Sequence, residues 1–291
     1  MTWDGVLVID KPAGPTSHDV VQRVRRLLGV KAGHTGTLDP AASGVLPLVL
    51  GRASRLSRFL AAGEKEYLAW IRLGLRTDSF DMEGRVLERR QVPELDAREL
   101  EEVLQCFRGE ILQVPPMFSA VKVGGRRLYE AARRGETVER VPRQVTVHAL
   151  VLLEREPERL QLRVRCSAGT YLRTLADDLG TRLGCGAVLE SLRRIRSGGF
   201  TLEQAVPLDQ LEERAAEALI PLDALLPELP PLEVDSVLAK RVVHGNAVPA
   251  PDPDLEQPGW LRIIHRGRLL ALGRASGGWV RPELVLATPG N

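Results

Sequence analysis

The stretch GHTGTLDPAASGVLP, residues 33–47, holds a single carboxylate, Asp39, among three glycines, two prolines, small hydroxyl side chains and a histidine. We expect a loop here, because the stretch lies between a helical and an apolar segment, and Gly36 and Gly44 allow backbone angles that other residues avoid. Asp39 precedes Pro40, which favours extended backbone at the acid. Two interpretations remain open: Asp39 shapes a turn through its side chain, or the loop holds one carboxylate against a substrate.

The segments on either side of this loop show helix and strand patterns that interleave without a regular period. Residues 5–9 form an apolar run typical of a buried strand. An amphipathic helix should follow, capped by Thr16 or Ser17 and ended by Gly29. Further strands are predicted over residues 66–75, 144–153 and 160–166, and further helices over residues 97–107 and 171–184. This order favours an α+β fold with a mixed, mainly antiparallel sheet flanked by helices.

A proline-rich segment separates a short C-terminal region from the rest of the chain. Four prolines fall within residues 219–232, which we interpret as an interdomain linker. Beyond it, residues 261–265 and 269–272 predict a hairpin. We therefore expect a large domain over residues 1–228 and a small β domain over residues 229–291.

The composition argues against several classes of protein. The chain has 291 residues and a formal net charge of +2. Its longest apolar run, residues 45–50, is far too short for a membrane span, and the N-terminus lacks the basic region of a secretory signal. Three cysteines without a C-x-x-C pair argue against disulfides and zinc, so we expect buried thiols and a cytoplasmic protein. Nucleotide-binding fingerprints and metal-ligand histidine spacings are missing too, so we expect no cofactor and no metal.

Charge is distributed unevenly along the chain. Residues 11–58 carry eight basic and two acidic side chains, and residues 122–143 carry seven basic and three acidic ones. Residues 201–235, in contrast, carry one basic and nine acidic side chains. A basic face suits a polyanion such as nucleic acid, although solvated helix faces would explain any one of these clusters taken alone.

Two further segments carry residues that could act on a substrate. Tyr171 and Arg173 follow a glycine-containing turn at a predicted helix start. They either cap the helix and face solvent, or aim the arginine at an acid elsewhere in the chain. Tyr67 lies in a predicted strand, where tyrosine is usually a core residue, yet the charged Lys65 and Glu66 precede it.

Several separated motifs follow one another in a fixed order along the chain. They are VIDKPAGPTS (8–17), the stretch 33–47, KEY (65–67), RTD (76–78), VPPMFSA (114–120), CSAGTYLR (166–173), LGCGA (183–187) and LRR (192–194). In this order they resemble the TruB family of bacterial tRNA pseudouridine synthases, from residue 5 to about residue 200. The resemblance implies a pseudouridine synthase fold with an insertion over about 108–145 that clamps RNA. It also implies a small PUA-like β domain at the C-terminus, where the match is weak.

The resemblance implies an activity and a catalytic group. The family isomerises uridine 55 in the T loop of tRNA to pseudouridine, flipping the base out of its stack and using a catalytic aspartate without a cofactor. Asp39 matches that aspartate, Arg173 matches the arginine paired with it, and Tyr171 matches its neighbour in the active site. The expected partner is the T stem-loop of tRNA, and we expect a monomer with no obligate protein partner and no membrane contact.

The remaining substrate-binding residues follow from the same motifs. Tyr67 matches the tyrosine that stacks on the target base, and His34 matches the histidine that helps to hold the flipped-out nucleotide. Leu192 matches an apolar residue of the pocket. Lys11, in the first motif, is expected to bind substrate as well.

Two other functions remain as alternatives. A uridine methyltransferase with a cysteine nucleophile would need a methyl-donor site, and no glycine fingerprint for one is present. Cys106, on one face of a predicted helix, is expected to be buried. In an RNA-binding or RNA-folding module without enzymatic activity, the basic segments would remain and Asp39 would only shape its turn.

Overall fold

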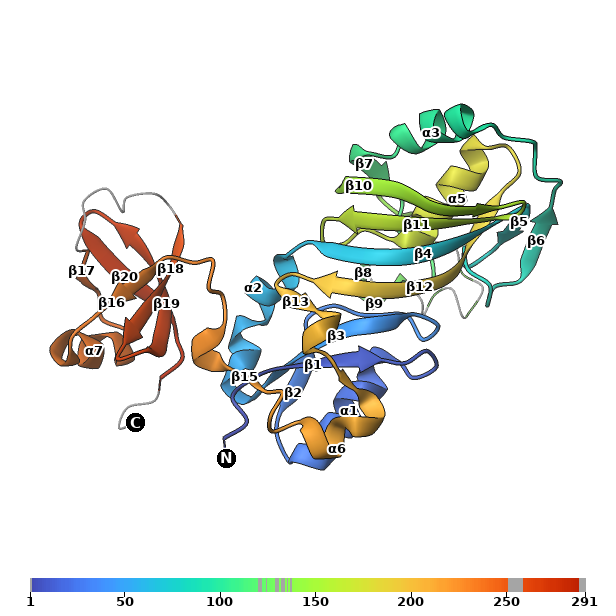
Figure 1. Cartoon of the computed structure of the whole chain (residues 1–291). Coiled ribbons are helices and arrows are strands. Elements are labelled where there is room, and N and C mark those ends of the chain that lie inside the picture. The colour runs from blue at the N-terminus through green and yellow to red at the C-terminus, as the bar shows by residue number, and fades with distance from the viewer. Residues whose placement is uncertain are drawn as a thin grey trace.

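The computed structural model describes residues 2–119, 122–123, 125–128, 131, 134, 136, 138–250 and 259–287. Its larger sheet has 11 strands in this part of the chain, and eight of them form a continuous path (Figure 1). In spatial order these are β14 (Val206–Pro207), β1 (Gly5–Lys11), β3 (Ser43–Leu50), β12 (Ala187–Ser197), β4 (Lys65–Leu73), β11 (Arg159–Cys166), β10 (Arg143–Glu156) and β7 (Gly109–Gln113). The other three are β2 (Ala32–His34) beside β3, β13 (Phe200–Thr201) beside β12 and β15 (Ile220–Pro221) beside β1.

The strand directions confirm the predicted α+β class with a mixed, mainly antiparallel sheet. Along the path only two pairs are parallel, β1 with β14 and β3 with β12. The remaining pairs are antiparallel. Two short hairpins lie outside this sheet: β5 (Leu75–Thr77) with β6 (Val86–Arg89), and β8 (Lys122–Val123) with β9 (Arg126–Arg127).

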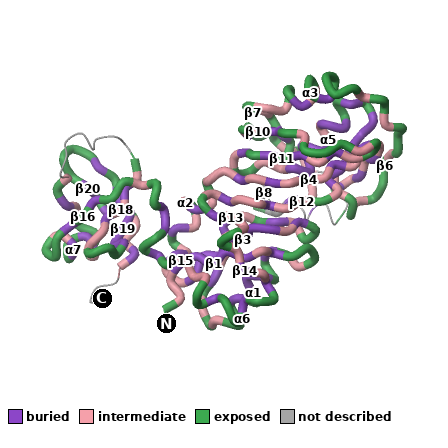
Figure 2. Tube along the Cα trace, viewed as in Figure 1, coloured by how far each residue is buried: buried purple, intermediate pink, exposed green. Residues whose placement is uncertain are grey.

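Helices pack their apolar faces against the larger sheet, except for the last helix, which packs against the C-terminal strands. The described helices are α1 (Ser17–Leu28), α2 (Ser57–Ala62), α3 (Ala97–Gln105), α5 (Leu172–Arg182), α6 (Leu211–Arg214) and α7 (Ser236–Val243). In α1, as predicted, the Thr16 hydroxyl caps the first turn and Gly29 ends the helix in the left-handed region, with φ 62°. Buried residues follow the sheet and the inner faces of its helices (Figure 2). No helix within the described ranges is long and apolar enough to cross a membrane.

The prediction that residues 33–47 form one loop is partly wrong. Strand β2 extends through His34 and β3 begins at Ser43, so only residues 35–42 form the loop. Strand β3 begins within the stretch because Gly44 packs against β12. The φ of Gly44 is 102°, and an added Cβ would lie 2.1 Å from the backbone oxygen of Arg194. Only glycine lets the two strands approach closely enough to pair there.

Strand β12 was not predicted from the sequence, although it lies in the middle of the larger sheet. It joins β3 on one side and β4 on the other. Its sequence, AVLESLRRIRS, carries four ionisable side chains and lacks the alternation of a typical strand. Strand β12 links the two halves of the sheet and brings Leu192 and Arg194 beside the loop that holds Asp39.

The C-terminal region forms a second sheet of five strands, as expected for a small β domain. Its order is β16 (Pro231–Glu233), β18 (Trp260–His265), β19 (Arg268–Ser276), β20 (Trp279–Val285) and β17 (Val248–Pro249). The predicted hairpin is β18–β19, turning at Arg266 and Gly267. The chain leaves the first sheet at β15 and enters the second at β16, on either side of the proposed boundary at residue 228.

The two sheets share an apolar cluster. Val6 and Val8 of β1 pack in one cluster with Leu269 and Leu272 of β19. The Asp223 carboxylate also accepts a hydrogen bond of 2.7 Å from the backbone N–H of Leu269. The segment we interpreted as a linker therefore contributes to the packing between the sheets.

Candidate active site

The loop that carries Asp39 is held to α1 and β1 by buried side chains. The Ser17 hydroxyl donates to the backbone oxygen of Leu38 at 2.9 Å and accepts from the backbone N–H of Leu38 at 2.8 Å. The ammonium group of Lys11, which is fully buried, donates to the backbone oxygens of Pro40 at 3.1 Å and Ala42 at 2.6 Å. These bonds fix the backbone on both sides of Asp39.

A third contact comes from β12. Arg194, only 1% exposed, donates from Nε to the backbone oxygen of Val45 at 2.7 Å and from Nη2 to that of Gly36 at 3.1 Å. Its guanidinium therefore joins the first half of the loop to the start of β3. Lys11 and Arg194 thus support the loop from two strands that lie on either side of β3.

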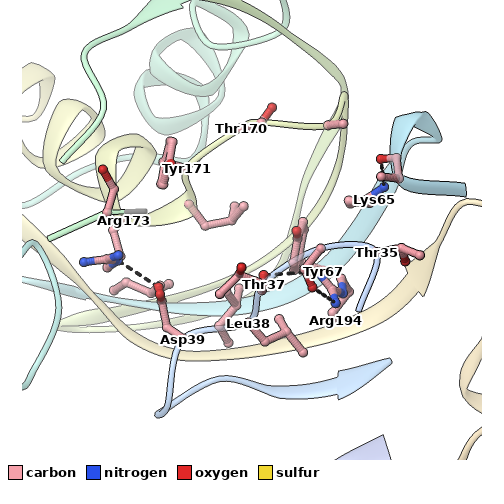
Figure 3. A pocket seen from close by; sticks show the side chains of 18 residues that line it. Thr35, Thr37, Leu38, Asp39, Lys65, Tyr67, Thr170, Tyr171, Arg173 and Arg194 are labelled. Atoms are coloured by element: carbon pink, nitrogen blue, oxygen red, sulfur yellow. Dashed lines mark hydrogen bonds and ion pairs between the residues drawn. The ribbon is translucent and has the colours of Figure 1, made fainter. Parts of the chain in front are cut away.

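Asp39 meets the arginine that the sequence analysis paired with it. Arg173 Nε lies 3.0 Å from Asp39 Oδ2 (Figure 3). Arg173 Nη1 lies 3.6 Å from Oδ2 of a second acid, Asp81. The guanidinium also donates to the backbone oxygens of Ser79 and Phe118, at 3.3 Å and 2.7 Å. The Arg173 side chain is 6% exposed, whereas that of Asp39 is 43% exposed. A buried, fully engaged arginine thus orients a carboxylate that solvent or a substrate can reach.

The Asp39 carboxylate borders a pocket of about 310 Å³. The pocket is lined by Thr35, Gly36, Thr37, Leu38, Asp39, Ala61, Lys65, Tyr67, Ser119, Ala168, Gly169, Thr170, Tyr171, Leu172, Arg173, Leu189, Leu192 and Arg194. Asp39 and Arg173 lie together at one end of it, and Lys65 and Thr35 lie at the other (Figure 3). Residues far apart in the sequence thus converge on one cavity.

Five of the seven predicted site residues line this pocket: Asp39, Tyr67, Tyr171, Arg173 and Leu192. Tyr67 comes from β4 and Leu192 from β12, which is the neighbouring strand. Tyr171 precedes α5, and its backbone is held by the buried Gln113 amide, which donates to the Tyr171 carbonyl at 3.3 Å and accepts from its N–H at 3.0 Å.

The other two, His34 and Lys11, do not line the pocket. His34 lies at the end of β2, where the loop begins, and its Nδ1 is buried and has no hydrogen-bond partner among the residues that the structure describes. Lys11 lies under the loop, and its ammonium group donates to three backbone oxygens, including that of Pro12. The geometry of Lys11 favours support of the loop over direct contact with a substrate.

Burial changes the protonation of several groups near the pocket. Burial raises the pKa of the Tyr67 hydroxyl, which is therefore neutral at physiological pH. Burial, followed by the positive charge of Arg194, lowers the pKa of His34 and favours its neutral imidazole. Burial also lowers the pKa of Lys65 and of Lys11 to about 8 each, so that both are predominantly charged at pH 7.

Two hydroxyls in the pocket wall lack partners within the described part of the chain. Thr35 Oγ1 and Ser119 Oγ belong to side chains that are almost completely buried, and neither makes a hydrogen bond to a described residue. Buried polar groups in native proteins are almost always satisfied. These two hydroxyls are therefore available for polar groups of a bound substrate.

Three residues of the site were not given a role by the sequence analysis: Asp81, Lys65 and Arg194. Lys65 and Arg194 fall inside motifs quoted for the family resemblance, so their position in the sequence was a signal. Asp81 lies in a polar segment between strands, and nothing local marks it. Its proximity to Arg173 depends on tertiary packing.

The expectation that each cysteine thiol is buried is wrong for Cys106. Cys166 and Cys185 are buried, but Cys106 is exposed, because it lies at the C-terminal end of α3 rather than on its inner face. Its thiol lies beside the Arg182 guanidinium, at 3.4 Å from Nη2, and outside the pocket. No group of three or more metal-ligating side chains occurs in the ranges that the structure describes.

Models of protein families match nearly the whole chain. Residues 25–172 match the N-terminal domain of the TruB family of pseudouridylate synthases. Residues 173–233 match a tRNA pseudouridylate synthase B C-terminal domain, and residues 230–286 match the C-terminal domain of pseudouridine synthase II TruB.

Individual proteins give the same result. A Chromohalobacter salexigens protein named tRNA pseudouridine synthase B is 46% identical over 291 residues, covering 98% of this chain and 95% of that protein. A Burkholderia lata protein of the same name is 48% identical over 293 residues, covering 98% and 91%. Among solved structures, the fold is similar to a chain in a crystal structure of a Cbf5-Nop10-Gar1 complex. Here the TM-score is 0.76 and the identity 31%, covering 98% of this chain and 86% of that one. The chain belongs to the TruB family of pseudouridylate synthases.

Proposed function

We propose that this protein isomerises uridine 55 in the T loop of tRNA to pseudouridine, with Asp39 as its catalytic group. Its family and the names of its relatives support a tRNA pseudouridine synthase. The observation that carries the assignment of Asp39 is its accessible carboxylate at the edge of the pocket, 3.0 Å from the buried Arg173. A carboxylate that only shaped a turn would not need this guanidinium.

The reaction suits a site with one accessible carboxylate. Uracil is detached from C1′ of its ribose, turned, and rejoined through C5. The net change neither oxidises the substrate nor adds a group to it, so the reaction needs no co-substrate or cofactor. Asp39 can act as a nucleophile toward C1′ or as a base toward the ribose, and both routes use the same held carboxylate.

Base flipping assigns roles to the aromatic and apolar walls. Extracting a stacked base costs a few kcal/mol, and stacking on an aromatic side chain returns about 1–3 kcal/mol. Tyr67 is neutral and lines the pocket, so it can supply this surface. Leu192 and Tyr171 complete a wall that excludes water, and neutral His34, outside the pocket, helps to hold the displaced RNA.

Basic segments supply the attraction for RNA. We propose that residues 108–145 clamp the T stem-loop. Of the basic span 122–143 in this insertion, residues 124, 129–130, 132–133, 135 and 137 lie outside the described part of the chain. The small β domain, proposed to span residues 229–291 and to be PUA-like, extends the same RNA-binding surface. We propose that the protein acts as a cytoplasmic monomer. Its affinity for RNA should decrease steeply as salt increases, because phosphate contacts release counterions.

Substitution of Asp39 by asparagine tests the assignment. Asp39→Asn keeps the size and the loop contacts but removes the charge, so a T stem-loop transcript should still bind. Release of tritium from C5 of the labelled target uridine should fall by about 10³-fold or more. A transcript with cytidine at the target is the matched control for background release. Undiminished tritium release by Asp39→Asn would refute the catalytic role, and tritium release from a different uridine would refute the site.

A further inference from the structure

The end of the pocket opposite Asp39 contains two buried cations, Lys65 and Arg194. Both line the cavity, and their residues are 6% and 1% exposed. The Lys65 ammonium donates to the backbone oxygens of Ala61 at 2.8 Å and Gly63 at 2.5 Å. Arg194 likewise donates to backbone oxygens. Every acceptor named here is an uncharged carbonyl.

Acidic side chains near Lys65 are engaged by other arginines. Glu64 lies 3.6 Å from Arg196, and Glu66 lies 2.7 Å from Arg163. Within the described residues, neither Lys65 nor Arg194 forms an ion pair, that is, neither has a carboxylate oxygen within 4.0 Å. Keeping buried charges without a counter-charge is costly. Two such charges beside one cavity therefore favour an occupant that carries negative charge.

The proposed reaction generates such an occupant. When the bond between C1′ and N1 breaks, its electron pair stays on N1, and the uracil leaves as an anion. Asp39 loses its negative charge in the same stage, either by forming a bond to C1′ or by accepting a proton from C2′. A negative charge therefore moves from the Asp39 carboxylate to the base. Later the C5 electrons form the bond to C1′, and Asp39 regains its charge, because its own bond to C1′ breaks or its proton returns to C2′. The C5 proton then leaves to solvent and N1 takes up a proton from solvent.

We propose that Lys65 and Arg194 form a cationic wall that stabilises the detached uracil anion while it turns. This inference rests on the proposed function and adds to it the charge-stabilising groups of the transition state. Fixed charges in a site that excludes water act strongly, because the low dielectric does not screen them. The buried, unpartnered hydroxyl of Thr35 lies at the same end and can donate to a uracil oxygen (Figure 3).

A leaving-group experiment tests this proposal. Fluorine at C5 withdraws electrons and stabilises the uracil anion, so 5-fluorouridine depends less on protein cations. Single-turnover loss of the N1-linked nucleoside is measured in T stem-loop transcripts with uridine or 5-fluorouridine at the target. Lys65→Met and Arg194→Met should each slow the uridine reaction by about 10²-fold and slow the 5-fluorouridine reaction much less.

Two further variants separate charge from structure. Arg194→Lys keeps the charge but changes the loop contacts, so it should recover most of the rate that Arg194→Met loses. Arg193→Met is the matched control on the same strand, because Arg193 pairs with Asp10 at 2.8 Å and lies outside the pocket wall. It should leave the ratio of the two rates unchanged.

Several outcomes would overturn the cationic wall. Equal slowing of both substrates would assign a structural role, and weaker RNA binding with an unchanged single-turnover rate would assign the pair to a backbone phosphate. If Arg194→Met fails to fold, as judged by circular dichroism, Lys65→Met decides the question alone. Failure of the proposed function is distinguishable, because the wild-type protein would then form no pseudouridine from the uridine transcript.

Discussion

The two ends of the pocket differ in whether their cations are paired with acidic side chains. At one end, the Arg173 guanidinium lies between the carboxylates of Asp39 and Asp81. At the other, Lys65 and Arg194 donate to backbone carbonyls, and Arg194 also to the Tyr67 side chain, but among the described residues neither has a carboxylate within 4.0 Å. A cation matched by acids mainly fixes geometry, because its charge is already neutralised. A cation without an acid can respond to charge that appears only during a reaction.

Removal of Arg173 should give the largest effect after loss of Asp39 itself. In Arg173→Met, two carboxylates would face each other without the guanidinium between them, and the orientation of Asp39 would be lost. We expect kcat to fall by about 10²–10³-fold, for uridine and 5-fluorouridine alike. Single-turnover kinetics measures this loss. If Arg173→Met slowed the uridine reaction much more than the 5-fluorouridine reaction, Arg173 would also stabilise the leaving uracil, and the two ends of the pocket would not differ in role.

The pH dependence of turnover should sharpen the comparison. Burial lowers the pKa of Lys65 from an ordinary value of 10.5 to about 8, with Arg194 acting in the same direction. The nearby Cys166 thiol remains neutral in this range, because burial raises its pKa to about 11. Turnover should therefore fall as pH increases through about 8, as Lys65 loses its proton. In Lys65→Met the fall should be smaller, because only Lys11, under the loop, then titrates with a pKa of about 8. A wild-type profile that stays flat from pH 7 to 9.5 would contradict it.

Stability should change in the opposite direction over the same range. Between pH 8 and 10.5 the unfolded chain keeps a proton on Lys65 that the folded protein has lost, so the free energy of unfolding increases with pH. Lys65→Met lacks this contribution. The stability of the wild type relative to Lys65→Met should therefore increase between pH 8 and 10.5, as measured by urea unfolding. A decrease would show that Lys65 is stabilised as a cation in the fold.

The two buried lysines should differ in what they support. Lys11 lies under the loop, outside the pocket, and donates to the backbone oxygens of Pro40 and Ala42. Lys11→Met leaves these acceptors unsatisfied, so we expect the free energy of unfolding to fall by about 1–3 kcal/mol. Turnover of the folded fraction should be lowered less than in Lys65→Met. A larger loss of turnover in Lys11→Met, with unchanged stability, would assign Lys11 to the substrate as first expected.

The smallest effect is expected far from both ends of the pocket. Cys106 is exposed and lies beside Arg182. Cys106→Ala should change kcat by less than about twofold, since surface substitutions seldom matter when they remove no buried contact. Loss of turnover in this variant would revive a cysteine nucleophile and the methyltransferase alternative.

Elements with a local signal were predictable from the sequence. Helix α1 carries its cap at Thr16 and its stop at Gly29, and the β18–β19 hairpin has apolar runs on both sides of a turn. Helix α7 was missed, although Asp235 caps it through the backbone N–H groups of Val237 and Leu238. This cap is a local helix signal inside a region predicted to be β.

Strand β12 and its side chains were not predictable in the same way. Arg193 pairs with Asp10 of β1, and Arg196 pairs with Glu66 of β4. These partners come from distant parts of the chain, so the strand looks too polar when it is considered alone. The same holds for Arg194, whose burial depends on backbone oxygens that only the folded loop presents. The motifs identified Asp39 and its partner Arg173, whereas the contact of Arg173 with Asp81 and the burial of Arg194 depended on tertiary structure.

The late position of these supports in the chain has a consequence for synthesis. Gly36 and the guanidinium that binds its carbonyl are separated by 158 positions in the sequence. Because chains emerge from the ribosome with the N-terminus first, the loop of residues 35–42 is released long before β12, the strand that holds it. A nascent polypeptide can expose basic segments to RNA during this interval, but it cannot modify that RNA. Activity therefore cannot begin before Arg194 has left the ribosome.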